Sequence, residues 1–372
     1  MKRFLIANDY LVGGGVENVL ENLVRYLLQQ GNKVTLMIPD VNQKEVQDLF
    51  GDGVSLYPTM RTLQKIKKYS LLWFWDRGLY VLQKLLYCIR FFFRQFDVLI
   101  ALKDGPTMRD LAGLYGKKKI AWVHTDFLHM HWTKCCFHSD EEERKCMMKF
   151  DNVVCVSKAS ADSVVKTIGD PGNLCVKYNP MNYREIVEKA SSSCMEIKNT
   201  DGPLFVSVGR LAFPKNYSLL VDVCKQLTKK YNFELWIIGD GPDRSEVQKR
   251  IDDYKLKNIK LLGNQTNPYC FLKRADVFVS TSICESYGLA IQEALILGIP
   301  VVAIECPAIR ETLDTGFGLL VDNDFDALYA AMEKIILQPK LCEEYRENIK
   351  QYYDLDDLYE KRLQSICTLW EE

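Results

Sequence analysis

The length, composition and charge of the chain exclude several classes of protein. Its 372 residues suggest two domains, and 48% of them are hydrophobic, which is enough for sizeable cores. A net charge of −1 gives no overall electrostatic case for nucleic acid binding. The 13 cysteines follow no spaced disulfide framework, the N-terminus lacks an export signal, and no apolar run approaches the roughly 20 residues of a spanning helix. We expect a reduced, cytoplasmic protein.

A glycine-rich loop follows the first predicted strand. Apolar residues 4–7 are followed by Gly13, Gly14 and Gly15, and then by a helix pattern over residues 16–30. Such a loop lets backbone approach a phosphate, although glycines also serve simply as flexible turns. The dinucleotide fingerprint is not met, because its third glycine position holds Asn18.

The segment from Arg61 to Arg94 is basic and aromatic. The segment contains eight Lys or Arg residues and a single acid, Asp76, and tryptophans, tyrosines and phenylalanines lie between the basic residues. Cations interleaved with aromatic rings suit an anionic membrane surface. The alternative is an ordinary helix that packs on the sheet with its leucine face.

A polar triplet, His124-Thr125-Asp126, follows the strand predicted over residues 118–123. Residues just past a buried parallel strand point into the crevice of an α/β fold, so His124 is a candidate site residue. All four histidines lie between His124 and His138, near two cysteines. Their spacings match no zinc motif, so we expect surface-loop chemistry there and no metal.

The composition predicts two domains and a linker. Residues 1–180 form the first domain, the polar stretch 181–202 forms the linker, and residues 203–353 form the second. A final helix pattern, 354–372, is expected to pack back on the first domain. In the second domain six strand patterns alternate with helix patterns, which predicts a parallel sheet covered on both faces.

Two cations follow the first strand of this second series. Arg210 and Lys215 lie five residues apart in a strand–helix loop, where they are able to clamp a diphosphate. As an isolated pair they would more often be solvated surface charges.

Two carboxylates bracket the start of a short helix, predicted over residues 288–297 because Gly298 and Pro300 end it. Glu285 precedes the helix and Glu293 lies inside it, with the amides of Gly288 to Ala290 between them. A helix N-terminus attracts phosphate, which leaves the two acids to accept hydrogen bonds from hydroxyls. The alternative is that Glu285 caps the helix and Glu293 is solvated.

Together these segments resemble the family 4 retaining glycosyltransferases, which have the GT-B architecture of two Rossmann-like domains facing across a cleft. The resemblance covers nearly the whole chain and rests on GGGVENVL, WVHTDF, VVCVSKASADSV, YNPMN, VSVGRLAFPKN, IIGDGPDRSEV and ESYGLAIQEALILGIPVVA. The last three motifs, in that order, are the most specific.

The resemblance implies roles for individual residues. Glu285 faces the donor sugar, Glu293 binds the ribose hydroxyls, and Arg210 and Lys215 bind the donor diphosphate with help from the amides of Gly288 and Leu289. His124 lies beside the transferred sugar. Gly14 and Gly15 lie near the phosphates and the acceptor, and Asp126 is a further catalytic candidate.

The resemblance also implies an activity. We expect transfer of a hexose or aminohexose from a nucleotide-diphosphate sugar, with UDP favoured, to a lipid-linked oligosaccharide or a cell-surface polysaccharide precursor such as capsule or lipopolysaccharide. No cofactor or metal is expected, and the protein is expected to lie peripherally on the inner face of the cytoplasmic membrane. The alternatives are a nucleotide-sugar epimerase of the same fold and a non-catalytic nucleotide-sugar binding protein.

Overall fold

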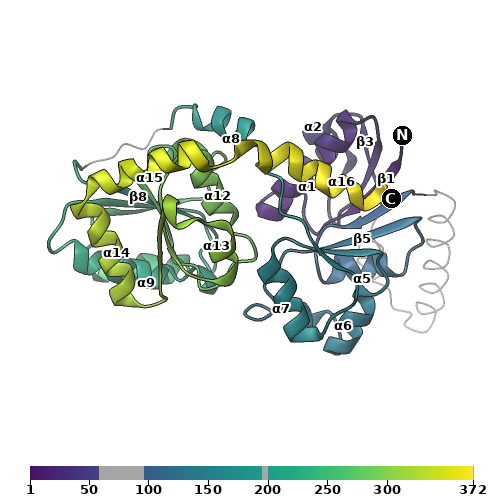
Figure 1. Cartoon of the computed structure of the whole chain (residues 1–372), viewed down its shortest axis with the longest axis horizontal. Helices are drawn as coiled ribbons and strands as arrows, with labels where there is room; N and C mark the ends of the chain where they lie inside the picture. The colour runs from purple at the N-terminus through teal and green to yellow at the C-terminus, as the bar shows by residue number, and fades with distance from the viewer. Residues whose placement is uncertain (58–95, 195–199, 372) are drawn as a thin grey trace, which may run out of the picture. The chain divides into compact units, whose positions relative to one another are not determined.

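The computed structural model describes residues 1–57, 96–194 and 200–371, which form two compact units (Figure 1). Unit 1 comprises Met1–Met181 together with Glu360–Glu372, and unit 2 comprises Asn182–Tyr359. Each unit has one sheet of parallel strands with helices on its faces. The predicted α/β class, with two Rossmann-like domains, is confirmed.

Unit 1 alternates strands and helices along the chain. Its elements are β1 (Arg3–Ala7), α1 (Gly15–Gln29), β2 (Lys33–Met37), α2 (Gln43–Phe50), β3 (Val54–Leu56), β4 (Val98–Ala101), α5 (Pro106–Ala112), β5 (Lys118–Val123), η1 (Trp132–Cys135), α6 (Asp140–Met147), β6 (Asn152–Cys155), α7 (Lys158–Ile168), β7 (Leu174–Val176) and α16 (Arg362–Glu371). The strand order is β3-β2-β1-β4-β5-β6-β7, so the direction of winding reverses between β1 and β4.

Unit 2 repeats this plan with six strands. Its elements are α8 (Tyr183–Ala190), β8 (Leu204–Val208), η2 (Phe213–Lys215), α9 (Tyr217–Leu227), β9 (Glu234–Ile238), α10 (Arg244–Asp253), β10 (Ile259–Gly263), α11 (Tyr269–Leu272), β11 (Val277–Ser280), α12 (Leu289–Ile296), β12 (Val301–Ile304), α13 (Pro307–Thr312), η3 (Thr315–Phe317), β13 (Gly318–Val321), α14 (Phe325–Leu337) and α15 (Pro339–Tyr352). A π-helical turn, η4 (Asp357–Lys361), leads from unit 2 into unit 1. The order is β10-β9-β8-β11-β12-β13, so the winding reverses between β8 and β11.

The strands form where short apolar runs end at turn-forming residues. All four residues of β4 and all five of β9 are buried, as expected for central strands of a sheet covered on both faces. In such sheets ligands bind beyond the carboxyl ends of the strands, at the point where the winding reverses. Ligand sites are therefore expected at the loops after β1 and β4 in unit 1, and after β8 and β11 in unit 2.

The structure differs from the sequence-based expectations in the stretch expected to be a linker. Residues 181–202 contain helix α8, whose N-cap Asn182 accepts a hydrogen bond from the Glu185 amide at 3.3 Å, and this helix is part of unit 2. Helix α2 and strand β3 were also not predicted. The final helix is α16, and in Figure 1 it lies along unit 1, where Trp370 packs edge-on against Phe4 with ring centroids 5.2 Å apart.

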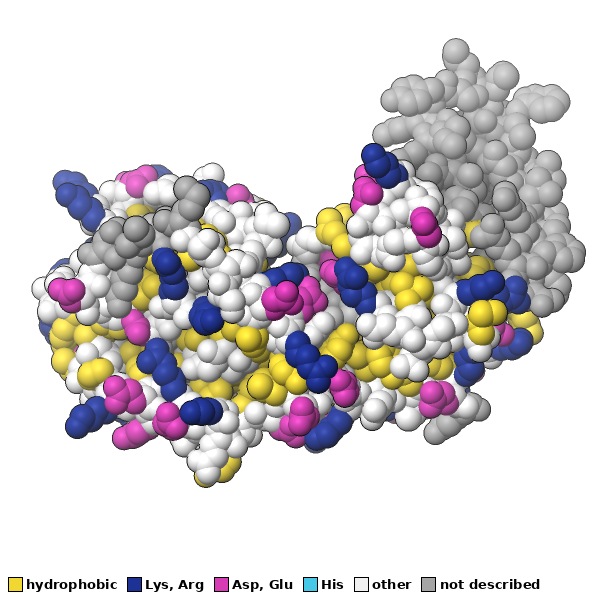
Figure 2. Space-filling model, turned by 90° about the horizontal axis from the view of Figure 1, so that it is seen from above, with side chains coloured by type: hydrophobic (Ala, Val, Ile, Leu, Met, Phe, Trp, Pro, Cys, Tyr) yellow, Lys and Arg dark blue, Asp and Glu magenta, His cyan; other side chains and the backbone are white. Residues whose placement is uncertain are grey.

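The described surface carries both signs of charge. Figure 2 shows Lys and Arg side chains interspersed with Asp and Glu side chains over the visible face. Within the described ranges no helix is long and apolar enough to cross a membrane. The whole of the basic aromatic segment from Arg61 to Arg94 lies outside the described residues, so its membrane role stays a prediction.

Candidate functional site

One predicted cation, Lys215, and one predicted acid, Glu285, meet at the winding reversal of unit 2. Lys215 closes the loop after β8, Glu285 lies in the loop after β11, and these strands are neighbours. The Lys215 ammonium lies 2.5 Å from the Glu285 carboxylate. Burial alone would lower the pKa of Lys215, but the charge of Glu285 and its hydrogen bond outweigh that effect and raise it. Lys215 is therefore a fixed cation at neutral pH.

Hydrogen bonds to main-chain carbonyls hold these two loops together. The Thr281 hydroxyl donates to the Lys215 carbonyl at 2.7 Å, and the Ile283 amide donates to the Pro214 carbonyl at 2.9 Å. Arg210, in the same loop as Lys215, is exposed and has no hydrogen-bond or ion-pair partner among the described residues. One cation is thus held in place and a second is available to an anion.

Glycines in the motif after β9 allow the neighbouring loop to pack against the Arg210 loop. Gly239 has φ +134°, and a Cβ there would lie 2.1 Å from the Gly209 carbonyl oxygen. A Cβ at Gly241 would lie 2.2 Å from the Leu211 carbonyl oxygen. The amides of Gly209 and Leu211 donate to the Ile238 and Asp240 carbonyls, each at 3.0 Å. The position of Arg210 therefore depends on backbone-to-backbone packing that only glycine permits.

The N-terminus of α12 supplies backbone donors beside Glu285. Its N-cap, Gly288, is left-handed with φ +80°, and no side chain caps the helix. The amides of Ile291 and Gln292 both donate to the Gly288 carbonyl, whereas those of Leu289 and Ala290 find no acceptor in the described part of the chain. Unpaired amides and the helix dipole together favour an anion here.

Glu293 is buried, contrary to the solvated alternative considered for it. The residue is 9% exposed, and its carboxylate accepts a hydrogen bond from the Tyr269 hydroxyl at 3.1 Å. Burial raises its pKa to about 7, against the opposing effects of the Tyr269 hydrogen bond and the charge of Lys215. A buried carboxylate with so few donors is costly to the fold and indicates a binding role.

We expect Glu293→Gln to stabilise the unliganded protein at pH 8 by about 2–3 kcal/mol. Folding raises the pKa of this carboxyl from 4.5 to about 7, so the stability from its neutral form is lost as pH rises between these values. The neutral amide avoids that loss. Urea unfolding at pH 5 and pH 8 measures the gain, which should be small at pH 5. A variant no more stable than the parent at pH 8 would contradict the assignment, and Glu285→Gln, which breaks the pair with Lys215, should not stabilise.

In unit 1 the glycine-rich loop leads from β1 into α1. Gly13 has φ +123°. Gly14 is extended, and a Cβ there would lie 2.8 Å from Glu17 Oε2. Gly15 begins α1. Glu17 is buried and accepts a hydrogen bond from Asn8 Nδ2 at 3.3 Å, which ties the first turn of α1 to the residue after β1.

His124 follows β5, as predicted, and its imidazole is neutral. Burial, and next the charge of Lys103, lower its pKa to about 3, against a hydrogen bond to the Leu102 backbone. Its Nε2 atom is buried and has no hydrogen-bond partner among the described residues. An unpaired polar atom of this kind is suited to a ligand hydroxyl.

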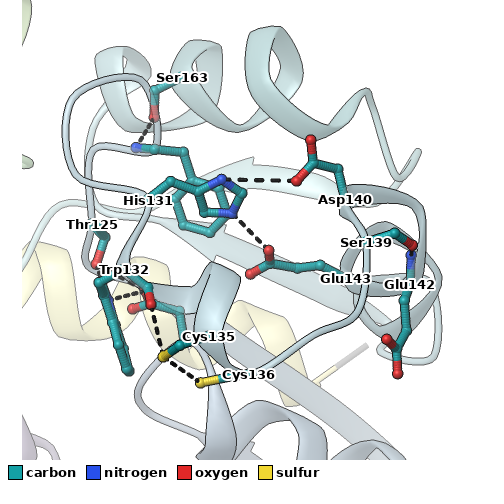
Figure 3. Close-up of polar contacts among 12 residues, drawn as sticks. Thr125, His131, Trp132, Cys135, Cys136, Ser139, Asp140, Glu142, Glu143 and Ser163 are labelled. Carbon is teal, nitrogen blue, oxygen red and sulfur yellow. Dashed lines mark hydrogen bonds and ion pairs between the residues drawn. The ribbon is translucent and has the colours of Figure 1, made fainter.

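Asp126 is engaged in its own turn. Its carboxylate accepts a hydrogen bond from the Leu128 amide at 3.0 Å and lies 2.7 Å from the Nδ1 atom of exposed His129. A catalytic role for Asp126 stays a prediction. The expectation of surface chemistry for the whole histidine cluster is wrong for His131, whose side chain is 7% exposed, stacks on Phe127 and contacts Glu143 at 2.7 Å (Figure 3).

Two unpredicted residues lie in the loop between β4 and α5. Asp104 is fully buried and binds the His124 segment, and Lys103 contacts the loop after β1. In the sequence these two residues stand out only as a polar pair just past a buried strand, and none of the motifs described above includes them. No cluster of three His, Cys, Asp or Glu able to hold a metal ion occurs within residues 1–57, 96–194 and 200–371.

Two family models match the chain, one in each half. The model described as Glycosyltransferase Family 4 matches residues 13–184, and the model described as Glycosyl transferases group 1 matches residues 195–352. The boundary between them falls close to the boundary between the two units.

Curated relatives match parts of the chain. An uncharacterized glycosyltransferase of Methanocaldococcus jannaschii is 38% identical over 28% of this chain and 27% of its own length. The N-acetylgalactosamine-N,N'-diacetylbacillosaminyl-diphospho-undecaprenol 4-alpha-N-acetylgalactosaminyltransferase of Campylobacter jejuni is 27% identical over 54% of this chain and 55% of its own. The chain thus spans about half, or less, of the length of these relatives.

Solved structures match over the full length. TarM of S. aureus has a TM-score of 0.75 at 14% identity, covering 100% of this chain and 99% of its own. Anabaena HepE in complex with UDP and glucose has a TM-score of 0.73 at 15% identity, covering 99% of this chain and 100% of its own. At such identities the likeness establishes the fold alone.

Proposed function

This chain belongs to the family 4 glycosyltransferases, and from that premise we propose that it transfers a hexose or aminohexose from a nucleoside-diphosphate sugar to a lipid-linked saccharide or polysaccharide precursor. The observation that carries the proposal is the anion site of unit 2. Lys215, exposed Arg210 and the α12 amides that have no acceptor among the described residues lie at the winding reversal, beside a buried carboxylate.

The chemistry of the step explains these residues. When the bond from the anomeric carbon to the diphosphate breaks, negative charge collects on the diphosphate and positive charge on the sugar ring. Fixed cations and oriented amides stabilise the diphosphate because they need no reorganisation as the bond breaks. Glu293 then accepts hydrogen bonds from ribose hydroxyls, and Glu285 does so from the donor sugar.

We propose that transfer retains the anomeric configuration. The acceptor oxygen forms the new bond to the anomeric carbon on the face from which the diphosphate leaves, and the acceptor proton passes to a diphosphate oxygen. The two-carboxylate mechanism of glycoside hydrolases is not needed, because Glu285 is paired with Lys215 and Glu293 binds hydroxyls. Neutral His124 offers Nε2 as an acceptor for a sugar hydroxyl. No metal takes part in this scheme.

The donor and acceptor classes draw support from the relatives. The HepE structure contains UDP and glucose, which supports a UDP-sugar donor. The Campylobacter relative is named for a diphospho-undecaprenol substrate, and a Rhizobium meliloti relative for lipopolysaccharide core biosynthesis, which support a lipid-linked acceptor or polysaccharide precursor. A lipid-linked acceptor would place the enzyme on the cytoplasmic membrane surface. Co-sedimentation with vesicles that contain anionic lipid tests this location, and failure to co-sediment with them would reject it.

A panel of UDP-, GDP- and ADP-sugars tests the function. A ligand at a concentration 100 times its Kd stabilises the folded state by about 2.7 kcal/mol, so the true donor should raise Tm clearly above the others. We expect a UDP-sugar to do so, and we expect nucleotide release to require an acceptor. No stabilisation by any member would contradict the proposal.

The same panel separates the alternatives. A nucleotide-sugar epimerase would convert the donor with no acceptor present, so chromatography of the donor after incubation alone detects it. A binding protein without activity would be stabilised by the donor yet release no nucleotide with any saccharide acceptor.

A further inference from the structure

Asp104 is a fully buried carboxylate that holds the His124 segment. Its Oδ1 atom accepts a hydrogen bond from the His124 amide at 3.3 Å. Its Oδ2 atom accepts bonds from the Thr125 hydroxyl at 2.8 Å and from the Trp132 indole at 3.0 Å. The indole also lies 3.0 Å from the Thr125 hydroxyl, and Figure 3 shows Thr125 and Trp132 side by side. Three donors from two segments thus converge on one carboxyl group.

Keeping this carboxyl buried is unfavourable for the fold by itself. Burial raises the pKa of Asp104, and the hydrogen bonds from Thr125 and the backbone offset this only in part. A well-packed apolar residue would avoid the desolvation cost. The hydrogen bonds do provide direction, because they fix the backbone at the end of β5, from which the His124 ring projects.

The preceding residue, Lys103, holds the other loop of this sheet edge. Its ammonium lies 3.5 Å from the Asp9 carboxylate, which also accepts a hydrogen bond from the Thr107 hydroxyl at 2.8 Å. The same ammonium lies 5.1 Å from the centre of the Tyr10 ring and 5.5 Å from that of Trp132. Because β1, β4 and β5 are adjacent, these contacts join the glycine-rich loop after β1 to the loop after β5.

We propose that Lys103 and Asp104 are positioning residues for transfer, with Asp104 setting the place of His124 and Lys103 setting the loop that leads to Gly14 and Gly15. The inference rests on the proposed function. Neither residue needs to touch a substrate, since each acts through the segment it holds. Displacing a reacting group by about 1 Å can cost about 10²-fold in rate, so such positioning has a large effect on turnover.

Asp104→Asn tests this inference because it replaces one carboxylate oxygen with an NH₂ group and leaves the side chain the same size. Whichever way the amide is turned, its NH₂ faces an N–H donor, either that of His124 or that of Trp132, so one bond is replaced by a donor–donor contact. We expect kcat to fall about 10- to 100-fold while the Kd of the donor, which unit 2 binds, stays within about twofold. Trp132→Phe removes one of the clashing donors, so adding it to Asp104→Asn should restore part of the lost kcat.

A matched control separates positioning from general stability. Glu143 is a 1% exposed carboxylate of the same unit, bound to His131 at 2.7 Å. Glu143→Gln should lower Tm about as much as Asp104→Asn without changing kcat per folded molecule. Lys103→Met should raise the KM of the acceptor more than it changes the Kd of the donor.

The outcomes distinguish the positioning roles of Lys103 and Asp104 from the proposed function on which they rest. If His124→Ala lowers kcat but Asp104→Asn leaves it unchanged, or lowers it no more than Glu143→Gln does, the positioning role of Asp104 is overturned. If Lys103→Met leaves the KM of the acceptor unchanged, the role of Lys103 is overturned. If His124→Ala itself retains full turnover, the assignment of His124 in the proposed function is overturned instead.

Discussion

Replacing Arg210 and Lys215 together with alanine is expected to lower kcat by at least about 10³-fold, because removing one preorganised donor to a developing anion already costs about 10²–10³-fold. Lys215 is fixed by Glu285 at 2.5 Å, and Arg210 is exposed with no partner among the described residues, so the pair offers the leaving diphosphate two different cations. Steady-state release of nucleoside diphosphate measures the loss.

Single variants and a distant control make this result specific. Arg210→Ala should leave Tm unchanged, because its side chain makes no hydrogen bond or ion pair in the described structure, yet it should lower kcat. Lys229→Ala removes a lysine whose ammonium has Gln226, at 2.7 Å, as its hydrogen-bond partner among the described residues, and it should leave kcat unchanged. Turnover by the folded double variant within tenfold of the parent would refute the diphosphate assignment.

Gly239→Ala is expected to destabilise unit 2 by about 2–4 kcal/mol and to lower kcat by about 10²-fold. The residue has φ +134°, and its added Cβ would lie 2.1 Å from the Gly209 carbonyl oxygen, which is too close for any real contact. The backbone next to Arg210 must move to relieve this overlap. Urea unfolding and kcat measured on the folded fraction report the two effects.

Gly298→Ala is the matched control for the strain alone. Gly298 also has a left-handed φ, +73°, but nothing lies within 4 Å of a Cβ there. It should cost about 1 kcal/mol of stability and leave kcat per folded molecule unchanged. If both alanine variants behaved alike, the close packing of the two loops would not be what places Arg210.

Most of the unit 2 fold was predictable from the sequence because its buried strands are short apolar runs. The six strand patterns expected in this part of the chain correspond to strands β8 to β13, among them Leu204–Val208 and Val301–Ile304. Helix α8 was missed because residues 181–202 are polar and the helix has only eight residues, two of them buried. In unit 1, β3 has three residues, which is too short for an alternating pattern to appear.

The site was predictable where residues lie close together in the sequence, and less so where folding brings them together. The eight-residue spacing of Glu285 and Glu293 identified both acids. The helix predicted from residue 288 begins at Leu289, with Gly288 as its N-cap. The pairing of Lys215 with Glu285, 70 residues apart, was not predicted. The burial of Glu293 against Tyr269 and the hidden Asp104 also emerged only from the packed structure, because burial depends on distant segments.

The central claim is that unit 2 binds a nucleoside diphosphate through Arg210, Lys215 and the α12 amides. Calorimetric titration of the parent and of the Arg210→Ala/Lys215→Ala variant, each with UDP and with uridine, tests it most directly. We expect the parent to bind UDP at least about 100-fold more tightly than uridine, since charge-assisted hydrogen bonds contribute about 1.5–3 kcal/mol each, and we expect the variant to lose most of that difference. Equal binding of UDP and uridine by the parent, or an undiminished difference in the variant, would contradict the account.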